Sequence, residues 1–172
     1  MPMISIPEGH LRPARAAEAL RVYNLHRAAA SGLDRRFGRG PWSHISLALT
    51  LRRVLFSKTV HVFEQGDRIV GAFTLLPEKI DFYEEHWFSP GAAPALYLRS
   101  MSVAPEVQRH GIGRAMVLAG LDVARAGGFK ALRLDAYQAA GGAAGFYLKC
   151  GFSKVASGIF QGVALDVFEK RV

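Results

Sequence analysis

Residues 108–113, Gln-Arg-His-Gly-Ile-Gly, form the most specific chemical pattern in the sequence. They stand between a predicted strand and a predicted helix, and the first turn of a helix presents N–H groups that have no partner within the helix. These N–H groups, together with the positive end of the helix dipole, favour an anion. Arg109 and Arg114 can add charge-assisted hydrogen bonds to phosphate oxygens. The pattern therefore predicts a phosphate site, although glycines at such turns are also common for structural reasons alone.

A second pattern lies later in the chain, where residues 145–152 read Gly-Phe-Tyr-Leu-Lys-Cys-Gly-Phe. Residues 102–113, Ser-Val-Ala-Pro-Glu-Val-Gln-Arg-His-Gly-Ile-Gly, resemble the coenzyme A signature of the GCN5-related N-acetyltransferases, the GNAT family. The second pattern resembles the late helix and the following turn of the same family. The two motifs stand in the family's order, and the resemblance covers essentially the whole chain, most specifically residues 95–152.

The resemblance implies an N-acetyltransferase that uses acetyl-CoA as its co-substrate. In the family, two parallel strands splay apart and the pantetheine arm enters the gap, so we expect a bulge near residues 101–103. The main-chain amides of residues 109, 111, 113 and 114 would hold the pyrophosphate, and Val103 would offer its backbone to the pantetheine arm. The full set of implied cofactor-binding residues is Met101, Ser102, Val103, Gln108, Arg109, His110, Gly111, Ile112, Gly113, Arg114, Ala115, Gln138, Ala140 and Tyr147.

Tyr147 matches the family tyrosine that commonly protonates the departing thiolate, and it is the one catalytic residue that the resemblance implies. A phenol with a pKa near ~10 suits that role against a thiol near ~8.5. The alternative is a core tyrosine packed between Phe146 and Leu148. One position departs from the family pattern, since Ala140 stands where many members carry an asparagine that contacts the cofactor. Gln138 is the candidate substitute.

No general base is assigned by position. Tyr97 and Arg99 occupy the strand positions where numerous family members place a glutamate or a histidine. The period-two alternation of a strand predicts that both residues, with Met101 and Val103, lie on one face. An arginine then stands where a base would be expected.

Arg99 has two interpretations. It either forms a surface ion pair with Glu84 or Glu85, or faces the acceptor and binds a carboxylate or phosphate there. Glu84 and Glu85, with Asp81 and beside Trp87, could in turn hold an ammonium group. An acceptor that carries both charges, such as an amino acid, satisfies both demands. We therefore predict a small-molecule primary amine as the acceptor, with Arg99, Glu84 and Glu85 as substrate-binding residues.

The elements that must position these residues follow from periodicity and from glycine and proline signals. A helix over residues 14–30 is expected to end at Gly32, and a second helical pattern follows Pro41. We expect strands at residues 59–64, 68–76 and 95–103, a loop at 77–94, a helix at 113–126, a strand at 131–136, a helix at 140–149, and strands at 155–160 and 163–168. Hairpins and helical crossovers together predict one α/β domain over residues 1–172, with a mixed, mostly antiparallel sheet flanked by helices.

The 172 residues carry a formal net charge of +8, and the first 60 residues contain ten basic and three acidic side chains. A basic surplus of this kind suits a polyanion. The alternative function is therefore a nucleic-acid or acidic-partner binding module that uses Arg35, Arg36 and Arg39. Aromatic residues are not regularly interleaved with these arginines, so nucleic acid is not the expected partner. A non-catalytic acyl-CoA sensor is a third reading of the same motifs.

Cys150 is the only cysteine, which excludes an internal disulfide and favours a cytoplasmic location. No apolar run approaches the roughly 18 residues of a membrane-spanning helix, so no membrane association is expected. The six histidines lack ligand spacing, so no metal is expected. The aromatic residues between positions 82 and 88 could line a substrate cleft or a dimer contact, and a homodimer is the commonest oligomer.

Overall fold

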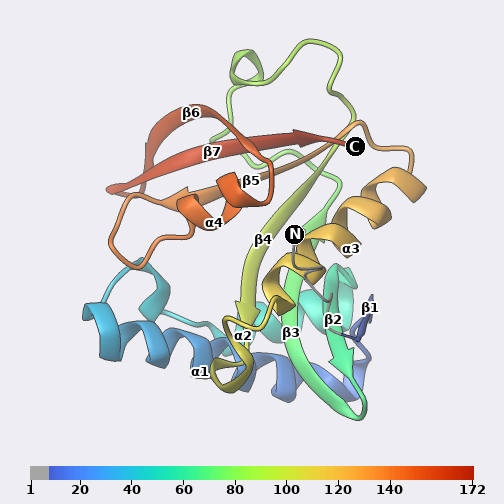
Figure 1. Cartoon of the computed structure of the whole chain (residues 1–172), viewed down its shortest axis with the longest axis vertical. Coiled ribbons are helices and arrows are strands. Elements are labelled where there is room, and N and C mark those ends of the chain that lie inside the picture. The colour runs from blue at the N-terminus through green and yellow to red at the C-terminus, as the bar shows by residue number, and fades with distance from the viewer. Residues whose placement is uncertain (1–7) are drawn as a thin grey trace, which may run out of the picture.

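A computed structural model describes residues 8–172 of the chain (Figure 1). The strands are β1 (His10–Pro13), β2 (Val60–Gln65), β3 (Arg68–Leu76), β4 (Ala95–Val103), β5 (Ala131–Tyr137), β6 (Ser153–Phe160) and β7 (Val163–Arg171), and the helices are α1 (Ala19–Phe37), α2 (Leu47–Arg52), α3 (Ile112–Ala126) and α4 (Ala144–Lys149). The strands form one sheet in the order β1-β2-β3-β4-β5-β7-β6. Within the described residues every neighbouring pair is antiparallel except β4 and β5. The predicted fold class is confirmed.

The first helix is longer than the sequence predicts. Its expected end at Gly32 is wrong, because α1 continues to Phe37 and ends at Gly38, which has a φ of 77°. A glycine costs only about 1 kcal/mol relative to alanine inside a helix. Tertiary contacts hold α1 on both sides of this position, since Leu25 packs in the core and Asp34 accepts hydrogen bonds from Trp42 and Ser43. Arg35 and Arg36 therefore lie in the last helical turn, where positive charge interacts favourably with the helix dipole, rather than in a loop.

The helices cover the two faces of the sheet in different places. On one face α3 packs over the central strands, and its Met116 and Val117 are fully buried against Leu96 and Leu98. On the opposite face α1 packs against β3 and the end of β4, and the loop of residues 77–94 covers the sheet beyond β4. Figure 1 shows α1 and this loop at opposite ends of β4, with a stretch of β4 between them that neither covers. That stretch is where the site lies.

β4 contains a bulge at its centre. Between Arg99 and Ser102, which both pair with β3, two residues of β4 face a single residue of β3. These two residues are Ser100 and Met101, and Ser100 has a φ of 53° in the left-handed region. The bulge therefore overlaps the predicted range of residues 101–103 and begins one residue before it.

The bulge reverses the alternation of side chains along β4. Tyr97 belongs to the buried cluster beneath the loop of residues 77–94, whereas Met101 and Val103 pack against the cluster beneath α3. The prediction that Tyr97, Arg99, Met101 and Val103 share one face is therefore wrong. The physical reason is the inserted residue, because one extra residue moves every later side chain to the other face.

β4 and β5 separate after three paired residues, as Figure 1 shows. Beyond that point β4 pairs only with β3, and β5 pairs only with β7. A buried ion pair closes the joined end, where the Nε atom of Arg133 donates to Glu169 at 2.9 Å and its Nη1 atom donates to the Tyr97 hydroxyl at 3.0 Å. Removing one partner of such a buried pair typically lowers the free energy of unfolding by about 3–5 kcal/mol. The joined end is thus firmly held, and the opposite end is open.

Candidate active site

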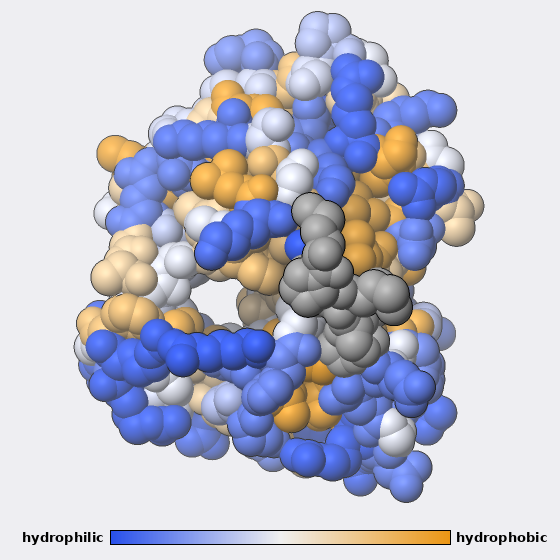
Figure 2. Space-filling model, in the orientation of Figure 1, coloured by the Kyte–Doolittle hydropathy of each residue, from blue (hydrophilic) through white to orange (hydrophobic). Residues whose placement is uncertain are grey.

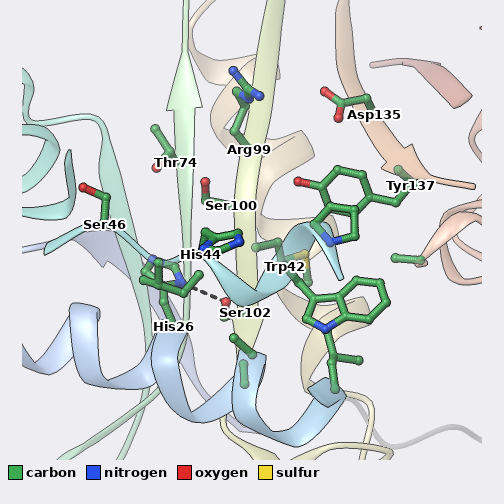
Figure 3. Close-up of a pocket in the computed structure, with 18 of the residues that line it drawn as sticks. His26, Trp42, His44, Ser46, Thr74, Arg99, Ser100, Ser102, Asp135 and Tyr137 are labelled. Carbon is green, nitrogen blue, oxygen red and sulfur yellow. Dashed lines mark hydrogen bonds between the residues drawn. The ribbon is translucent and has the colours of Figure 1, made fainter. Parts of the chain in front are cut away.

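A cavity of about 310 Å³ lies where β4 and β5 separate. Its walls come from α1, the segment of residues 41–46, α2 with the turn that follows it, β4, the end of β5 and the start of α4. Figure 2 shows an opening that passes through the molecule at this place, between the α1 region below and the α4 region above. Figure 3 shows the lining side chains, with His26 on the α1 wall, Arg99 on β4, and Asp135 and Tyr137 on β5.

The start of α3 carries a run of N–H groups that are free to bind a ligand. Within the described residues, none of the N–H groups of residues 109–114 makes a well-formed hydrogen bond to a backbone carbonyl. Arg109 and Gly111 have φ values of 68° and 84°, which turn the chain into the helix. The free N–H groups and the helix dipole fit a pyrophosphate. The N–H of Ala115 is different, because it donates to the Gly111 carbonyl at 3.0 Å.

The side chains of this segment divide into two groups. Arg109, His110 and Arg114 are exposed beside the helix start, and an arginine in such a position can reach phosphate oxygens. Ile112 is buried in the core and has only its N–H to offer to a ligand. The sequence pattern alone does not separate these roles, because all four residues lie within one short motif.

Three further predicted cofactor contacts already have partners or lie elsewhere. The side-chain amide of Gln108 donates to the Val103 carbonyl at 3.0 Å, so this carbonyl, predicted to meet the pantetheine arm, is occupied. The side-chain amide of Gln138 donates to Asp166 at 2.6 Å. Neither Gln138 nor Ala140 lines the cavity. Residues 108–115 do not line it either, but the start of α3 adjoins its wall, since a Cβ at Gly113 would lie 3.5 Å from the Cε atom of Met101.

Tyr147 lies on α4, which begins four residues later than the sequence predicts. Its ring packs edge-on against Phe152 in the core, and its hydroxyl lies 3.8 Å from the Sδ atom of Met101 across the gap between the strands. Burial, and to a lesser degree the charge of Asp135, raise the pKa of Tyr147, so the phenol keeps its proton at neutral pH. A thioether is a weak hydrogen-bond acceptor, so the hydroxyl remains available to a stronger one. Tyr147 is thus a core residue and a cavity residue at once.

Comparison with known proteins agrees with this geometry. The model of the acetyltransferase (GNAT) family matches residues 21–152. The chain belongs to this family. A search of curated proteins found no match. The match to the family model therefore confirms the predicted family.

Solved structures of the GNAT fold resemble the chain over almost its full length. An acetyltransferase of the GNAT family from Listeria monocytogenes is 19% identical, with a TM-score of 0.75 and 95% of each chain covered. A protein from Salmonella typhimurium, assigned as an acetyltransferase and solved with its cofactor acetyl-CoA, is 17% identical, with a TM-score of 0.64 and coverage of 96% of this chain and 94% of that chain. A protein assigned as a phosphinothricin N-acetyltransferase is 14% identical, with a TM-score of 0.66 and coverage of 95% and 98%. At these identities the likeness supports the fold.

On the acceptor side of this GNAT chain, Arg99 lines the cavity but Glu84 and Glu85 do not. Both glutamates are exposed, and neither forms an ion pair with Arg99. The structure therefore does not bring them to Arg99, and their role in holding the acceptor stays a prediction. The loop instead contributes Tyr83, whose hydroxyl donates to the Oδ2 atom of Asp135 at 2.7 Å. The loop turns its aromatic residues inward, because these give the larger gain on burial, and this leaves the glutamates in solvent.

Three lining residues were not singled out as site residues from the sequence. His26 from α1 places its Nδ1 atom 2.8 Å from the Ser102 hydroxyl, and burial lowers the pKa of His26 to about 4. Arg53, in the turn after α2, donates to the Ser100 hydroxyl at 3.0 Å. Asp135 reaches the cavity from β5. These residues lie far apart in sequence and share no motif spacing, so only the fold brings them together.

Two structural features are lacking in the part of the chain that the structure describes. No group of three or more His, Cys, Asp or Glu side chains within residues 8–172 is arranged to hold a metal ion. Over the same residues, no helix combines the length and the apolar character needed to cross a membrane.

Proposed function

We propose that the protein transfers an acetyl group from acetyl-CoA to the primary amine of a small molecule by direct attack. One relationship carries this proposal: Met101 of β4 lies between the start of α3 and Tyr147. A Cβ at Gly113 would lie 3.5 Å from the Cε atom of Met101, and the Tyr147 hydroxyl lies 3.8 Å from its Sδ atom. The free N–H groups at the start of α3 suit a pyrophosphate, and the Tyr147 hydroxyl suits a leaving sulfur. Membership of the GNAT family supports this combination of a pyrophosphate site and a proton donor for the sulfur.

The chain's own residues would divide the binding of the co-substrate. The amides of residues 109, 111, 113 and 114 would hold the pyrophosphate, with Arg109 and Arg114 adding charge. The edge of β4 that β5 leaves unpaired, which includes Met101 and Ser102, would offer its backbone to the pantetheine arm. Acetyl-CoA supplies an activated acetyl thioester when bound. Placing amine and thioester together removes much of the entropic barrier to the reaction.

Proton movement follows from the cavity walls. The bond from the amine nitrogen to the acetyl carbon forms as the carbon–sulfur bond breaks. The acceptor enters as an ammonium ion and loses two protons in the reaction. One of them replaces the proton that Tyr147 gives to the sulfur, and the other leaves to solvent. The lining groups able to accept a proton from the amine are Asp135, His44 and His26, and the pKa of about 4 makes His26 a weak base. These groups supply the general base, which the sequence pattern did not assign to any position on the strand.

The remaining sequence predictions stay predictions under this proposal. A cytoplasmic location rests on the single cysteine, and a homodimer rests on its frequency among oligomers. The seven-stranded sheet of the described residues supports one domain over residues 1–172. Arg35 and Arg36 face solvent on α1 away from the cavity, so a polyanion bound there would be a partner additional to the acetyl acceptor.

The proposal is tested by calorimetric titration of the protein with acetyl-CoA. Gly113→Pro removes one amide of the proposed pyrophosphate site at the second position of α3. Gly145→Pro is the matched control, since it places proline at the second position of α4, where a Cβ would meet no atom within 4 Å. We expect binding by the parent protein and by Gly145→Pro, and loss of binding in a folded Gly113→Pro. A folded parent protein that binds no acetyl-CoA would overturn the proposal.

Release of free thiol in the presence of an amine panel then separates an enzyme from a sensor. Tight acetyl-CoA binding with no thiol release for any amine would favour the non-catalytic acyl-CoA sensor.

A further inference from the structure

Two arginines line the cavity without an acidic partner. Arg53 donates its only side-chain hydrogen bond within the described residues to the Ser100 hydroxyl, at 3.0 Å. Arg99 is the residue before Ser100 on β4, and its side chain makes no hydrogen bond to any described residue, although its backbone pairs with β3. Neither guanidinium lies within 4.0 Å of a carboxylate of residues 8–172. The other arginines that lie inside the protein contrast with them, since Arg12 and Arg133 both pair with glutamates.

The charges inside the cavity do not balance. Burial, and then the positive charge of Arg99, lower the pKa of Arg53, so the two guanidinium groups repel each other. Asp135 is the only carboxylate among the lining residues, and its Oδ2 atom already accepts the Tyr83 hydroxyl. Both arginines are half-buried, and a partly desolvated charge is stabilised by a paired, hydrogen-bonded partner. An anion that enters the cavity would supply the missing partner, and two guanidinium groups suit a carboxylate or phosphate.

The arginine pair lies next to the atoms that would react. Ser100, which holds Arg53, adjoins Met101 in the chain, and consecutive Cα atoms are about 3.8 Å apart. The Met101 sulfur is in turn the atom that the Tyr147 hydroxyl faces. An anion bound by Arg53 and Arg99 would therefore lie beside the same stretch of β4 that carries Met101.

The rest of the cavity has an anionic side and an apolar side. Opposite β4, Figure 3 shows Asp135 on the β5 wall, from which its carboxylate can meet an ammonium group. Towards α1 and α2 the lining is mainly apolar and aromatic, with Leu33, Trp42, Ile45 and Leu49. The cavity thus offers a cationic part, an anionic part and an apolar part within about 310 Å³.

Resting on the proposed function, we infer that the acceptor is a compact α-amino acid with an apolar side chain. Its carboxylate binds Arg53 and Arg99, its ammonium group faces Asp135 and the thioester, and its side chain packs against Trp42 and the α2 side of the cavity. Glutamates of the loop of residues 77–94 have no part in this arrangement.

The test compares three acceptors that differ only in the acid group: leucine, leucinamide and 3-methylbutylamine. Thiol release is measured with acetyl-CoA, and the binding of each compound is measured by calorimetry without acetyl-CoA. We expect the amino acid to bind and react at least about tenfold better than the other two, which is the usual range for one charge-assisted hydrogen bond. Equal or better use of the amide or the amine, or no binding of leucine or phenylalanine, would overturn the inference.

Variants then assign the preference to the arginine pair. Arg53→Gln and Arg99→Gln are each expected to raise the KM for leucine about tenfold or more, and to remove the advantage of leucine over leucinamide, while acetyl-CoA affinity stays unchanged. Arg52→Gln is the matched control, since it removes an exposed charge from the neighbouring residue outside the cavity. An unchanged KM in both cavity variants would overturn the inference. A parent protein that binds no acetyl-CoA would instead overturn the proposed function, so the two failures differ.

Discussion

The Nδ1 atom of His26 in α1 lies 2.8 Å from the Oγ atom of Ser102 in β4 (Figure 3). This hydrogen bond joins the first helix to the strand that borders the cavity, just beyond the bulge. Burial, and then the charge of Arg53, lower the pKa of His26 to about 4. The bond is thus made by a neutral imidazole at neutral pH.

Acidification is expected to weaken the fold through His26. The pKa of His26 is 6.5 in the unfolded chain and about 4 in the fold, so the unfolded state binds more protons between these values. The free energy of unfolding should therefore fall as the pH is lowered from about 6.5 to about 4, by up to about 3 kcal/mol, with no effect of this group above that window. Urea unfolding at several pH values measures it.

His26→Asn is the variant that isolates this group, because an amide can keep a hydrogen bond to Ser102 but does not titrate. The loss of stability between pH 6.5 and 4 should be smaller in this variant, and His44→Asn, at an exposed position, should retain it. An acid dependence that is the same in His26→Asn as in the parent protein would contradict the assignment.

Removing the Tyr147 hydroxyl should reduce the rate and leave the fold intact. Tyr147→Phe is expected to lower kcat about 10²–10⁴-fold, the usual contribution of a general acid. The melting temperature and the acetyl-CoA affinity should change little, because the hydroxyl has only a thioether as partner within the described residues. Steady-state kinetics and calorimetry measure both. Tyr23→Phe, outside the cavity, is the control, and an unchanged kcat in Tyr147→Phe would remove the general-acid role.

Neutralising Arg99 should stabilise the protein when no ligand is present. Arg99→Gln removes the repulsion between Arg53 and Arg99, so the melting temperature should rise by about 2–4 °C, which corresponds to about 1 kcal/mol in a protein of this size. Differential scanning calorimetry measures the change. Arg52→Gln should leave the melting temperature unchanged, and a decrease in Arg99→Gln would mean that the arginine has a structural partner.

A methyl group at Gly71 should destabilise the packing of α3 on β3. A Cβ at Gly71 would collide with the sulfur of Met116, which is fully buried, and would lie 3.3 Å from the Ser102 carbonyl oxygen. Gly71→Ala should therefore lower the free energy of unfolding by about 1–3 kcal/mol, the usual effect of overpacking a core. Gly145→Ala, at an open helical position, should instead raise the free energy of unfolding by about 0.5–1 kcal/mol. Equal effects in urea unfolding would show that α3 can shift away from the strand.

The order of the elements could be predicted because each one has a local signal. The hairpin of β2 and β3 follows from a turn at residues 65–67 between β-rich segments, and the start of α3 follows from its glycines. The end of α1 could not be predicted, because tertiary packing outweighs the propensity of Gly32. The bulge of β4 was expected, but its start at Ser100 has no local signal, since a left-handed φ at a serine is set by its surroundings.

The two halves of the site were predictable to different degrees. The cofactor half lies within one continuous segment, so residues 109–114 could be found from a motif. The acceptor half combines residues such as His26, Arg53 and Asp135 that come from α1, the turn after α2, and β5. A sequence contains no spacing rule for residues brought together only by the fold. Of this half, only Arg99 was predicted from its strand position, and the other residues had to come from the structure.

The bulge of β4 also bears on how such a protein could change its acceptor during evolution. Arg99, before the bulge, lines the cavity that we propose for the acceptor, whereas the side chain of Met101, within it, lies next to the Tyr147 hydroxyl. A single strand therefore contains two neighbouring sets of positions that can vary independently. Substitutions before the bulge can alter which molecule is acetylated, while the edge that would meet the shared acetyl donor stays the same.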